Sequence, residues 1–275
     1  MAKPNYNKPT FYNVEANPNI EKMFGIYGYE KVAKLKDAAV VVFGGGPDVS
    51  PMLYGQSLNP TSCINFARDK RDIQALHATN DEQTLVGICR GAQFLNVMVG
   101  RGQLYQHVDN HAISGYHEAL VTDYKSKENV KVQVNSTHHQ MMIPGSTGDV
   151  LMRAMESTQF YGENPMKPVV HFKGLTDMYD TAGGADIEAV YYWDIKNCNG
   201  VFCYQPHPEF MNDPNNDGNT NNFFDLLERY CIPDKIVDQT LRPRAQRLHS
   251  FKAKREDNKR KEREKVGRVE ENQAV

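Results

Sequence analysis

The chain has 275 residues, of which 40% are hydrophobic, and a formal net charge of −2. That length is enough for one large domain with a sizeable core and a further segment, while the nearly neutral balance gives no reason to expect nucleic-acid binding by the whole molecule. No apolar run approaches the roughly 20 residues that span a bilayer, so we expect no membrane association.

The cysteines and the N-terminus indicate where the protein works. Five cysteines are scattered along the chain without a C-x-x-C pair, which argues against a disulfide framework and favours a reducing compartment. The N-terminal residues lack the apolar core of a secretory signal. We therefore expect a cytoplasmic protein.

Strand-like and helix-like segments alternate along the chain, as an α/β fold requires. The apolar runs at 38–43 and 84–88 are typical of strands buried on both faces. The expected order is strand 10–15, helix 20–36, strand 38–43, helix 68–80, strand 84–88, helix 92–99, strands 130–135, 150–154, 169–172, 187–192 and 200–205, and helix 223–230. This order predicts a mainly parallel central sheet with helices on both faces.

A Gly-x-Cys-x-Gly pattern lies where the strand at 84–88 meets the following helix, with Cys89 at its centre. Gly87 and Gly91 remove the Cβ atoms that would clash in so tight a turn. The first N–H groups of the helix would face the thiol and favour its thiolate form. A buried structural cysteine is the alternative, but glycine on both sides at this junction favours a nucleophile.

The strand-like run at 200–205 leads into Pro206, His207, Pro208 and Glu209. Residues i and i+2 of an extended chain project to the same side, so His207 and Glu209 share a face. A carboxylate beside an imidazole fixes its tautomer and supports the imidazolium. A surface turn would explain His-x-Glu alone equally well; together with the cysteine, the pair predicts a base and its orienting acid.

The cysteine and histidine motifs resemble those of class I glutamine amidotransferases, and among them the stand-alone γ-glutamyl hydrolases such as the γ-glutamyl-γ-aminobutyrate hydrolase group. Four further segments resemble that subgroup in the same order, at 44–51, 53–55, 102–106 and 134–140. The resemblance covers about residues 38–231. It implies a flavodoxin-like α/β fold with the nucleophile at the carboxyl end of a strand.

The resemblance also assigns roles to individual residues. It implies that Gly45 or Gly46 and the residue after the cysteine, Arg90, donate backbone N–H groups to an oxyanion hole. Gln93 would help to place the substrate. His138 would line the substrate pocket, with a structural role in capping its loop as the alternative. No metal or organic cofactor is needed for this chemistry.

The expected activity is hydrolysis of a γ-glutamyl amide bond in a small-molecule substrate, through a γ-glutamyl thioester. One alternative is a glutaminase subunit that passes ammonia to a synthase on a separate chain. Another is an inactive binding protein that keeps the fold, against which the intact Cys89, His207 and Glu209 argue. The sequence leaves the released amine and the oligomeric state open.

Two remaining features fall outside this core. His107, His111 and His117 have spacings that resemble those of metal ligands, but no cysteine or carboxylate cluster joins them convincingly, and a loop over the pocket is the favoured interpretation. We expect a catalytic domain over 1–233. The rest, 234–275, is rich in charges of both signs and poor in apolar residues, which predicts a charged C-terminal helix or disordered tail.

Overall fold

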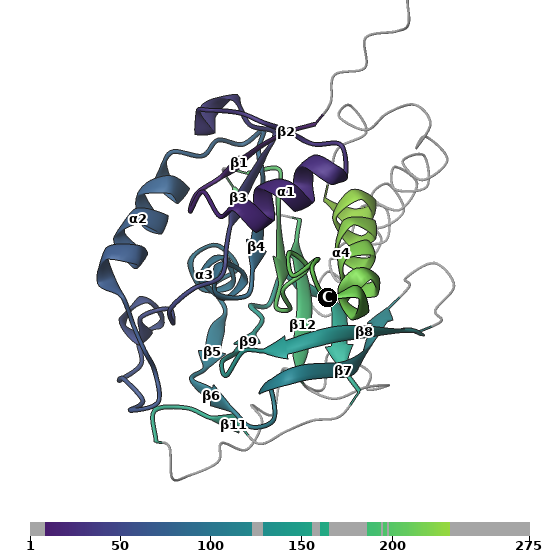
Figure 1. Ribbon diagram of the computed structural model, residues 1–275. Coiled ribbons are helices and arrows are strands. Elements are labelled where there is room, and N and C mark those ends of the chain that lie inside the picture. The colour runs from purple at the N-terminus through teal and green to yellow at the C-terminus, as the bar shows by residue number, and fades with distance from the viewer. Residues whose placement is uncertain are drawn as a thin grey trace, which may run out of the picture.

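The computed structural model describes residues 9–122, 129–155, 160–164, 186–193, 195, 196 and 198–231. A nine-stranded sheet forms its centre, with helices packed on both faces (Figure 1). The helices are α1 (Pro18–Ile26), α2 (Phe66–His77), α3 (Arg90–Met98) and α4 (Asp217–Tyr230), with short 3-10 helices at Leu35–Asp37, Pro51–Tyr54 and Pro214–Asn216. The strands are β1 (Thr10–Asn13), β2 (Glu30–Lys31), β3 (Val40–Phe43), β4 (Thr84–Ile88), β5 (Gln103–Tyr105), β6 (His107–Val108), β7 (Ala112–Thr122), β8 (Asn129–Thr137), β9 (Met141–Ile143), β10 (Gly148–Ala154), β11 (Phe160–Tyr161), β12 (Ile187–Tyr192) and β13 (Gly200–Tyr204).

The sheet has a parallel half and an antiparallel half. Its strand order is β2-β1-β3-β4-β13-β12-β10-β7-β8. In this order, the neighbours within β2-β1-β3-β4-β13 pair in parallel. The strands from β12 to β8 continue the sheet with antiparallel pairings. The α/β class is confirmed. The antiparallel extension was not expected, because the strand-like runs of the sequence carry no signal for direction.

Alternate residues of the buried strands face two separate cores. Val40 and Val42 of β3 pack in one core with residues of α1 and α4. Val41 and Phe43 pack in the other, with residues of α2 and α3. Figure 1 shows these helix pairs on opposite sides of the sheet. Burial on both faces explains why β3 reads as a continuous apolar run.

The register of the parallel half brings the two motifs of the sequence together. Residues Thr84 to Ile88 of β4 pair in order with Gly200 to Tyr204 of β13. Since parallel strands end at the same edge of a sheet, the segments that follow β4 and β13 leave the sheet side by side. This is where Cys89 and His207 are found.

The helix expected at 20–36 is correct only in its first part. Asn17 caps α1 by accepting a hydrogen bond from the Asn19 N–H, and Pro18 opens the helix. The helix ends at Ile26, and Gly28 then takes a left-handed φ of 88°, which a glycine adopts at little cost. The chain after this turn forms the edge strand β2, so the expected single helix was wrong.

The loop expected around residues 107–117 is also wrong. His107 belongs to the short strand β6, and His117 to the long strand β7, where it pairs opposite Val134 of β8. The polar residues of this segment give no clear strand pattern. The contacts that stabilise β7 come from β8 and β10, which lie later in the chain.

Other expectations fall beyond the described residues. The strand expected at 169–172 and the tail at 234–275 lie outside them, so the predicted domain boundary stays a prediction.

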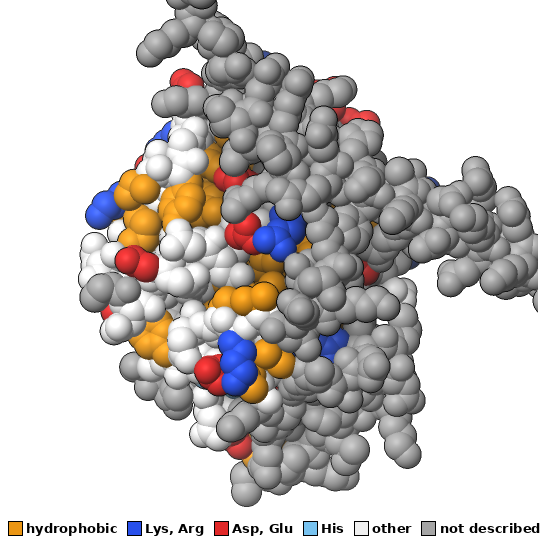
Figure 2. All heavy atoms as spheres, turned by 90° about the vertical axis from the view of Figure 1, so that its right-hand side faces the viewer, with side chains coloured by type: hydrophobic (Ala, Val, Ile, Leu, Met, Phe, Trp, Pro, Cys, Tyr) orange, Lys and Arg blue, Asp and Glu red, His pale blue; other side chains and the backbone are white. Residues whose placement is uncertain are grey.

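Among the helices that are described, none is long and apolar enough to cross a membrane. On the face seen in Figure 2, the acidic and basic side chains of the described residues are interspersed rather than gathered into a field of one sign.

Candidate active site

Cys89 lies in the turn between β4 and α3 with a strained backbone. Its φ of 51° and ψ of −111° are rare for a residue with a side chain. Such a conformation costs of the order of 1–3 kcal/mol and persists only where the surroundings enforce it. Here the Cys89 N–H donates to the carbonyl of Tyr204 on β13 at 2.9 Å. Strain of this kind clusters at functional positions.

The glycines on either side of Cys89 are required by packing. A Cβ at Gly87 would lie 2.5 Å from the backbone of Ala92 in α3, and one at Gly91 would lie 2.0 Å from the carbonyl oxygen of Phe43 at the end of β3. Neither contact is possible without moving the backbone. The clash within the turn, as deduced from the sequence, is confirmed for Gly87, whereas the clash at Gly91 is with the neighbouring strand β3.

His207 lies between Cys89 and Glu209. The Glu209 carboxylate holds the Nδ1 atom of His207 at 2.7 Å, and the ring of Phe210 stacks on the imidazole with centroids 4.5 Å apart. Burial lowers the pKa of His207, but hydrogen bonds and charge interactions with Cys89 and Glu209 outweigh burial and raise that pKa well above its ordinary value. The structure therefore brings the three predicted residues into one chain of interactions.

Asn135 of β8 holds the backbone of His207 from both sides. Its Nδ2 donates to the His207 carbonyl and its Oδ1 accepts from the His207 N–H, each at 2.7 Å. Asn216 adds a second donor to the same carbonyl at 3.0 Å. Sequence reasoning missed both residues. Asn135 could not be paired with His207 from local spacing, because 72 positions separate the two.

The glycine loop after β3 is held by Arg68 of α2. The Arg68 guanidinium donates to the carbonyl of Gly45 at 2.9 Å and to that of Gly44 at 2.8 Å. It also pairs with Glu15 at 2.6 Å and with Asp72 at 3.0 Å, and all three side chains are buried or nearly so. A planar guanidinium suits such fixed, multiple acceptors.

This arrangement sets the direction of the loop N–H groups. In a trans peptide the C=O and the following N–H point in opposite directions. Because the carbonyls of Gly44 and Gly45 point at Arg68, the N–H groups of Gly45 and Gly46 point away from it. A Cβ on Gly45 would lie 2.7 Å from Cε1 of His207, so the loop runs directly against the imidazole. Gly46 has a φ of 147°, which also favours glycine.

Arg90 joins the same buried network. Its guanidinium pairs with Asp69 and Asp72 of α2, and its Nε donates to the carbonyl of Pro47 at 3.2 Å. Burial, followed by repulsion from Arg68, lowers the pKa of Arg90 to about 10, so the side chain stays charged at neutral pH. Its backbone N–H is the first of α3 and has no partner within the helix.

Gln93 and Gln205 connect the start of α3 to the cysteine. Gln93 Nε2 donates to Gln205 Oε1 at 3.2 Å and to the carbonyl of Gln140 at 3.3 Å. Gln205 in turn donates to the Sγ of Cys89 at 3.7 Å. The predicted residue Gln93 thus reaches the thiol through Gln205, which the sequence analysis did not single out.

His138 is buried beside other histidines. Its side chain lies against Glu188, with Nε2 at 3.7 Å from Oε2, and its Nδ1 lies 3.0 Å from the carbonyl of Gln140. Burial lowers the pKa of His138 to about 4, so the ring is neutral at physiological pH. Its predicted contact with substrate stays a prediction. His111 and His117 lie in the same cluster, whereas His107 contacts Asp109.

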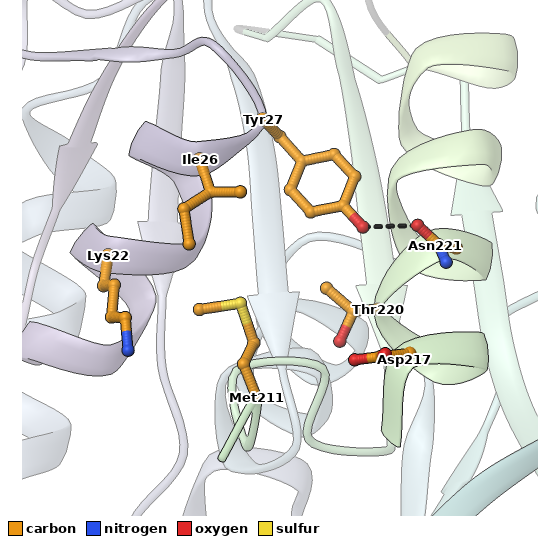
Figure 3. Close-up of a pocket in the computed structure, with 7 residues that line it drawn as sticks. All are labelled: Lys22, Ile26, Tyr27, Met211, Asp217, Thr220 and Asn221. Carbon is orange, nitrogen blue, oxygen red and sulfur yellow. Dashed lines mark hydrogen bonds between the residues drawn. The ribbon is translucent and has the colours of Figure 1, made fainter. Parts of the chain in front are cut away.

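A surface pocket opens between α1 and α4, away from these residues (Figure 3). It is lined by Lys22, Ile26, Tyr27, Met211, Asp217, Thr220 and Asn221. Tyr27 closes one side by donating a hydrogen bond to Asn221 at 2.5 Å. Thr220 donates at 2.6 Å to the carbonyl of Pro208, so the pocket adjoins the segment that carries His207, but Cys89, His207 and Glu209 are not among its lining residues.

Comparison with known proteins agrees with the motifs. The family described as Peptidase C26 matches residues 30–154. Over this stretch the chain is similar to the Peptidase C26 family. The matched stretch contains Cys89 and the glycine loop, whereas His207 and Glu209 lie beyond it.

Relatives of the chain carry names that refer to glutamine amidotransferases. The glutamine amidotransferase-like protein YvdE of Lactococcus lactis subsp. lactis is 32% identical over 118 residues, which is 37% of this chain and 50% of that protein. Its homolog in Lactococcus lactis subsp. cremoris is 34% identical over 121 residues, again 37% of this chain and 62% of that protein. The chain thus spans about half to three-fifths of these relatives. The solved structure of PurLQS from Thermotoga maritima aligns with a TM-score of 0.48 and 16% identity, covering 81% of this chain and 99% of that one.

Proposed function

We propose that this chain is a cysteine-dependent amidase that hydrolyses γ-glutamyl amide bonds. The observation that carries the proposal is the convergence of Cys89, His207 and Glu209 at the carboxyl ends of β4 and β13. A strained cysteine, a histidine of raised pKa and a buried carboxylate that orients it are the parts that nucleophilic acyl transfer requires.

The first half of the proposed reaction forms a thioester. The Cys89 thiolate attacks the δ-carbonyl of the γ-glutamyl group, and the carbonyl oxygen becomes an oxyanion. The backbone N–H groups of Arg90 and of Gly45 or Gly46 would stabilise that oxyanion, each commonly by about 3 kcal/mol. The His207 imidazolium then gives its proton to the departing amine, and the C–N bond breaks.

The second half restores the enzyme. His207, now neutral, takes a proton from a water molecule that attacks the thioester carbonyl. Collapse of the second tetrahedral intermediate breaks the C–S bond and releases glutamate, with Cys89 leaving as thiolate and His207 again protonated. Glu209 keeps its charge throughout and orients the imidazole.

The supporting residues fit this scheme. Arg68 and Arg90 would keep the glycine loop in the conformation that turns its N–H groups toward the reacting carbonyl. Gln205 would hold the Cys89 thiol in place through its hydrogen bond to Sγ, and Gln93 would orient the Gln205 amide. His138, as an untested substrate contact, would have to reach the ligand from its buried position.

The test is a substrate panel with two readouts. Purified full-length protein is given glutamine, several γ-glutamyl amines and a matched α-glutamyl amide, and glutamate and ammonia are measured separately. The proposal expects glutamate release from γ-glutamyl substrates, none from the α-isomer, and none from Cys89→Ser. Turnover that survives Cys89→Ser would overturn it, and a folded, inert wild type would favour the binding-protein alternative. A strong preference for glutamine itself would instead favour a subunit that supplies ammonia to a separate synthase.

A further inference from the structure

A second group of chemically active side chains lies around the ends of β7 and β8 and the start of β12. His111, His117 and His138 meet Asp186 and Glu188 there. Both carboxylates and the rings of His111 and His138 are almost completely buried. The proposed amidase reaction uses neither carboxylate, so their burial calls for a separate explanation.

Three of these residues leave atoms without partners that converge on one point. Among the described residues, His111 Nδ1, His138 Nε2 and Glu188 Oε2 have no hydrogen-bond partner. One ligand atom from each of the three residues lies within 4.8 Å of the other two. Buried polar atoms are normally satisfied, and three orphans aimed at each other indicate a missing group. We propose that His111, His138 and Glu188 bind one divalent transition-metal ion, Zn²⁺ above others.

The surrounding contacts give each histidine the tautomer that a ligand needs. The carbonyl of Gln140 can only accept, so His138 carries its hydrogen on Nδ1 and presents the lone pair of Nε2. The Asp186 carboxylate lies 2.8 Å from Nε2 of His111 and would accept a hydrogen bond from an Nε2–H group, which leaves the lone pair on Nδ1 free. Metal-bound histidines usually donate their second N–H to a carboxylate or a backbone carbonyl in this way.

His117 acts on the carboxylate rather than on the metal. Its Nε2 lies 3.0 Å from Oε1 of Glu188, which fixes the carboxylate with Oε2 on the side of His138 and Oε1 within 3.5 Å of His111 Nδ1. The sequence pattern offers His107, His111 and His117 as possible ligands without a carboxylate, and favours a loop over the pocket instead. The carboxylate comes from β12, which lies about 70 positions further along the chain, and no local spacing could reveal it.

The ligand set favours a transition metal over calcium and magnesium. Two imidazoles and one carboxylate suit zinc, while calcium and magnesium prefer oxygen ligands throughout. Ligand atoms about 2.0–2.1 Å from a tetrahedral zinc ion lie roughly 3.3–3.4 Å apart. His111 Nδ1 lies 3.5 Å from Oε1 of Glu188 and His138 Nε2 lies 3.7 Å from Oε2, so a carboxylate that offers both oxygens, or shifts of the side chains, would bring the ligands to that spacing. A dication would also offset the two buried carboxylates, and a fourth position remains for water.

The ion would join the strands that hold the catalytic residues. Ser136, beside Asn135, donates to the carbonyl of His111 at 3.0 Å, and the Gln205 N–H donates to the carbonyl of Glu188 at 2.8 Å. Asn135 positions His207, and Gln205 contacts Cys89. The metal site therefore stands beside the candidate active site, but it does not depend on the proposed reaction.

Zinc titration of the untagged, chelator-treated full-length chain tests this inference. We expect about one Zn²⁺ per chain by calorimetry and by elemental analysis, and the same stoichiometry in Cys89→Ser, which removes the thiol as a competing site. Co²⁺ in place of Zn²⁺ should give the visible absorption of a low-coordinate site without a thiolate charge-transfer band. Absence of saturable binding at micromolar zinc, or a thiolate band that disappears in Cys89→Ser, would overturn the proposal.

Graded variants locate the ion. Glu188→Gln keeps the volume and removes the ligand charge, so zinc affinity should fall at least about 100-fold; His117→Ala, which removes the residue that holds the carboxylate, should cost about 10–100-fold. His77→Gln, an exposed histidine on α2, is the matched control and should bind like wild type. Equal affinity in Glu188→Gln and wild type would contradict the assignment. If Glu188→Gln does not fold, the cobalt spectrum of wild type decides alone.

Discussion

At the scale of single residues, the candidate site depends on side chains that hold others in place. Asn135 is the clearest example, because it bonds both backbone groups of His207. Asn135→Ala should leave substrate binding nearly intact and lower kcat by up to about 100-fold, which is the cost of misplacing a catalytic group by about 1 Å. Steady-state kinetics that separate kcat from KM provide the measurement.

Asn135→Asp is the matched control for that prediction. The aspartate keeps the oxygen that accepts from the His207 N–H, but in place of the N–H donor it turns a charged oxygen toward the His207 carbonyl and Asn216 Oδ1. Its kcat should therefore fall at least as far as that of Asn135→Ala. A purely structural role would show as lower thermal stability with kcat unchanged in both variants, and that outcome would remove Asn135 from the account.

Glu209 should set the pH range of activity. Its carboxylate is one of the groups that raise the pKa of His207. The imidazolium protonates the leaving amine, so activity falls as pH rises through that pKa. Glu209→Gln removes the negative charge and lowers the pKa, and the alkaline limb of the pH–rate profile should move to lower pH by about 1 unit or more.

A comparison with His207→Ala checks the same assignment. Glu209→Gln should lower kcat by less than His207→Ala, because the imidazole remains. The double variant should cost little more than His207→Ala alone, since the two residues act as one unit. An alkaline limb that stays in place, or losses that add, would mean that Glu209 does not orient His207.

The sequence predicted the residues that form short motifs and missed those that meet only in the fold. Cys89, His207 and Glu209 were named from local spacing, and the structure brings them together. Asn135, Gln205 and Arg68 could not be found in this way, because each acts on a partner 23 to 116 positions away. Their side-chain types are ordinary, and only the sheet order gives them a role.

At the scale of elements, the glycine loop after β3 depends on α2. Arg68→Lys keeps the charge beside Glu15 and Asp72 but loses the planar fork that bonds two loop carbonyls. The loop N–H groups would then be free to turn. We expect kcat to fall by about 10²–10³, the effect of losing one oxyanion donor, with a smaller change in KM.

The contrasting outcome for this variant is a change in stability alone. If Arg68→Lys lowers the free energy of unfolding, measured by urea denaturation, and leaves kcat within about twofold of wild type, the network is structural and does not position the loop. Arg71→Lys on the same helix, at an exposed position, serves as the control and should alter neither quantity.

A helix or strand could be predicted from the sequence where its burial produces a clear pattern of apolar residues. The strand at 84–88 and the strand at 187–192 were predicted with their observed bounds, since each is buried along its whole length. The helix at 20–36 was extended too far because Gly28 and the edge strand β2 interrupt it. β7 was missed because its partners β8 and β10 come later in the chain.

At the scale of the whole molecule, the charged segment after residue 234 should be dispensable for chemistry. Its composition cannot bury much apolar surface, and every proposed site residue precedes it. A truncation after Ser250 should hydrolyse the best γ-glutamyl substrate within about twofold of full length, a difference of roughly 0.4 kcal/mol. Loss of turnover in a truncated protein that stays folded would show that the segment reaches the active site or a required partner.

The central claim is that Cys89 is the nucleophile of a γ-glutamyl hydrolase, and a pair of labelling reactions measured by peptide mapping tests it most directly. A glutamine-like diazo-ketone should modify Cys89 alone, while iodoacetamide should also modify Cys63, the exposed cysteine among the five. Burial raises the pKa of Cys198 to about 11 and also raises that of Cys203, so neither should compete. Modification of Cys89 by the diazo-ketone, with complete loss of turnover in step with labelling, is the predicted result. Labelling of another cysteine, with activity retained in Cys89→Ala, would contradict the account.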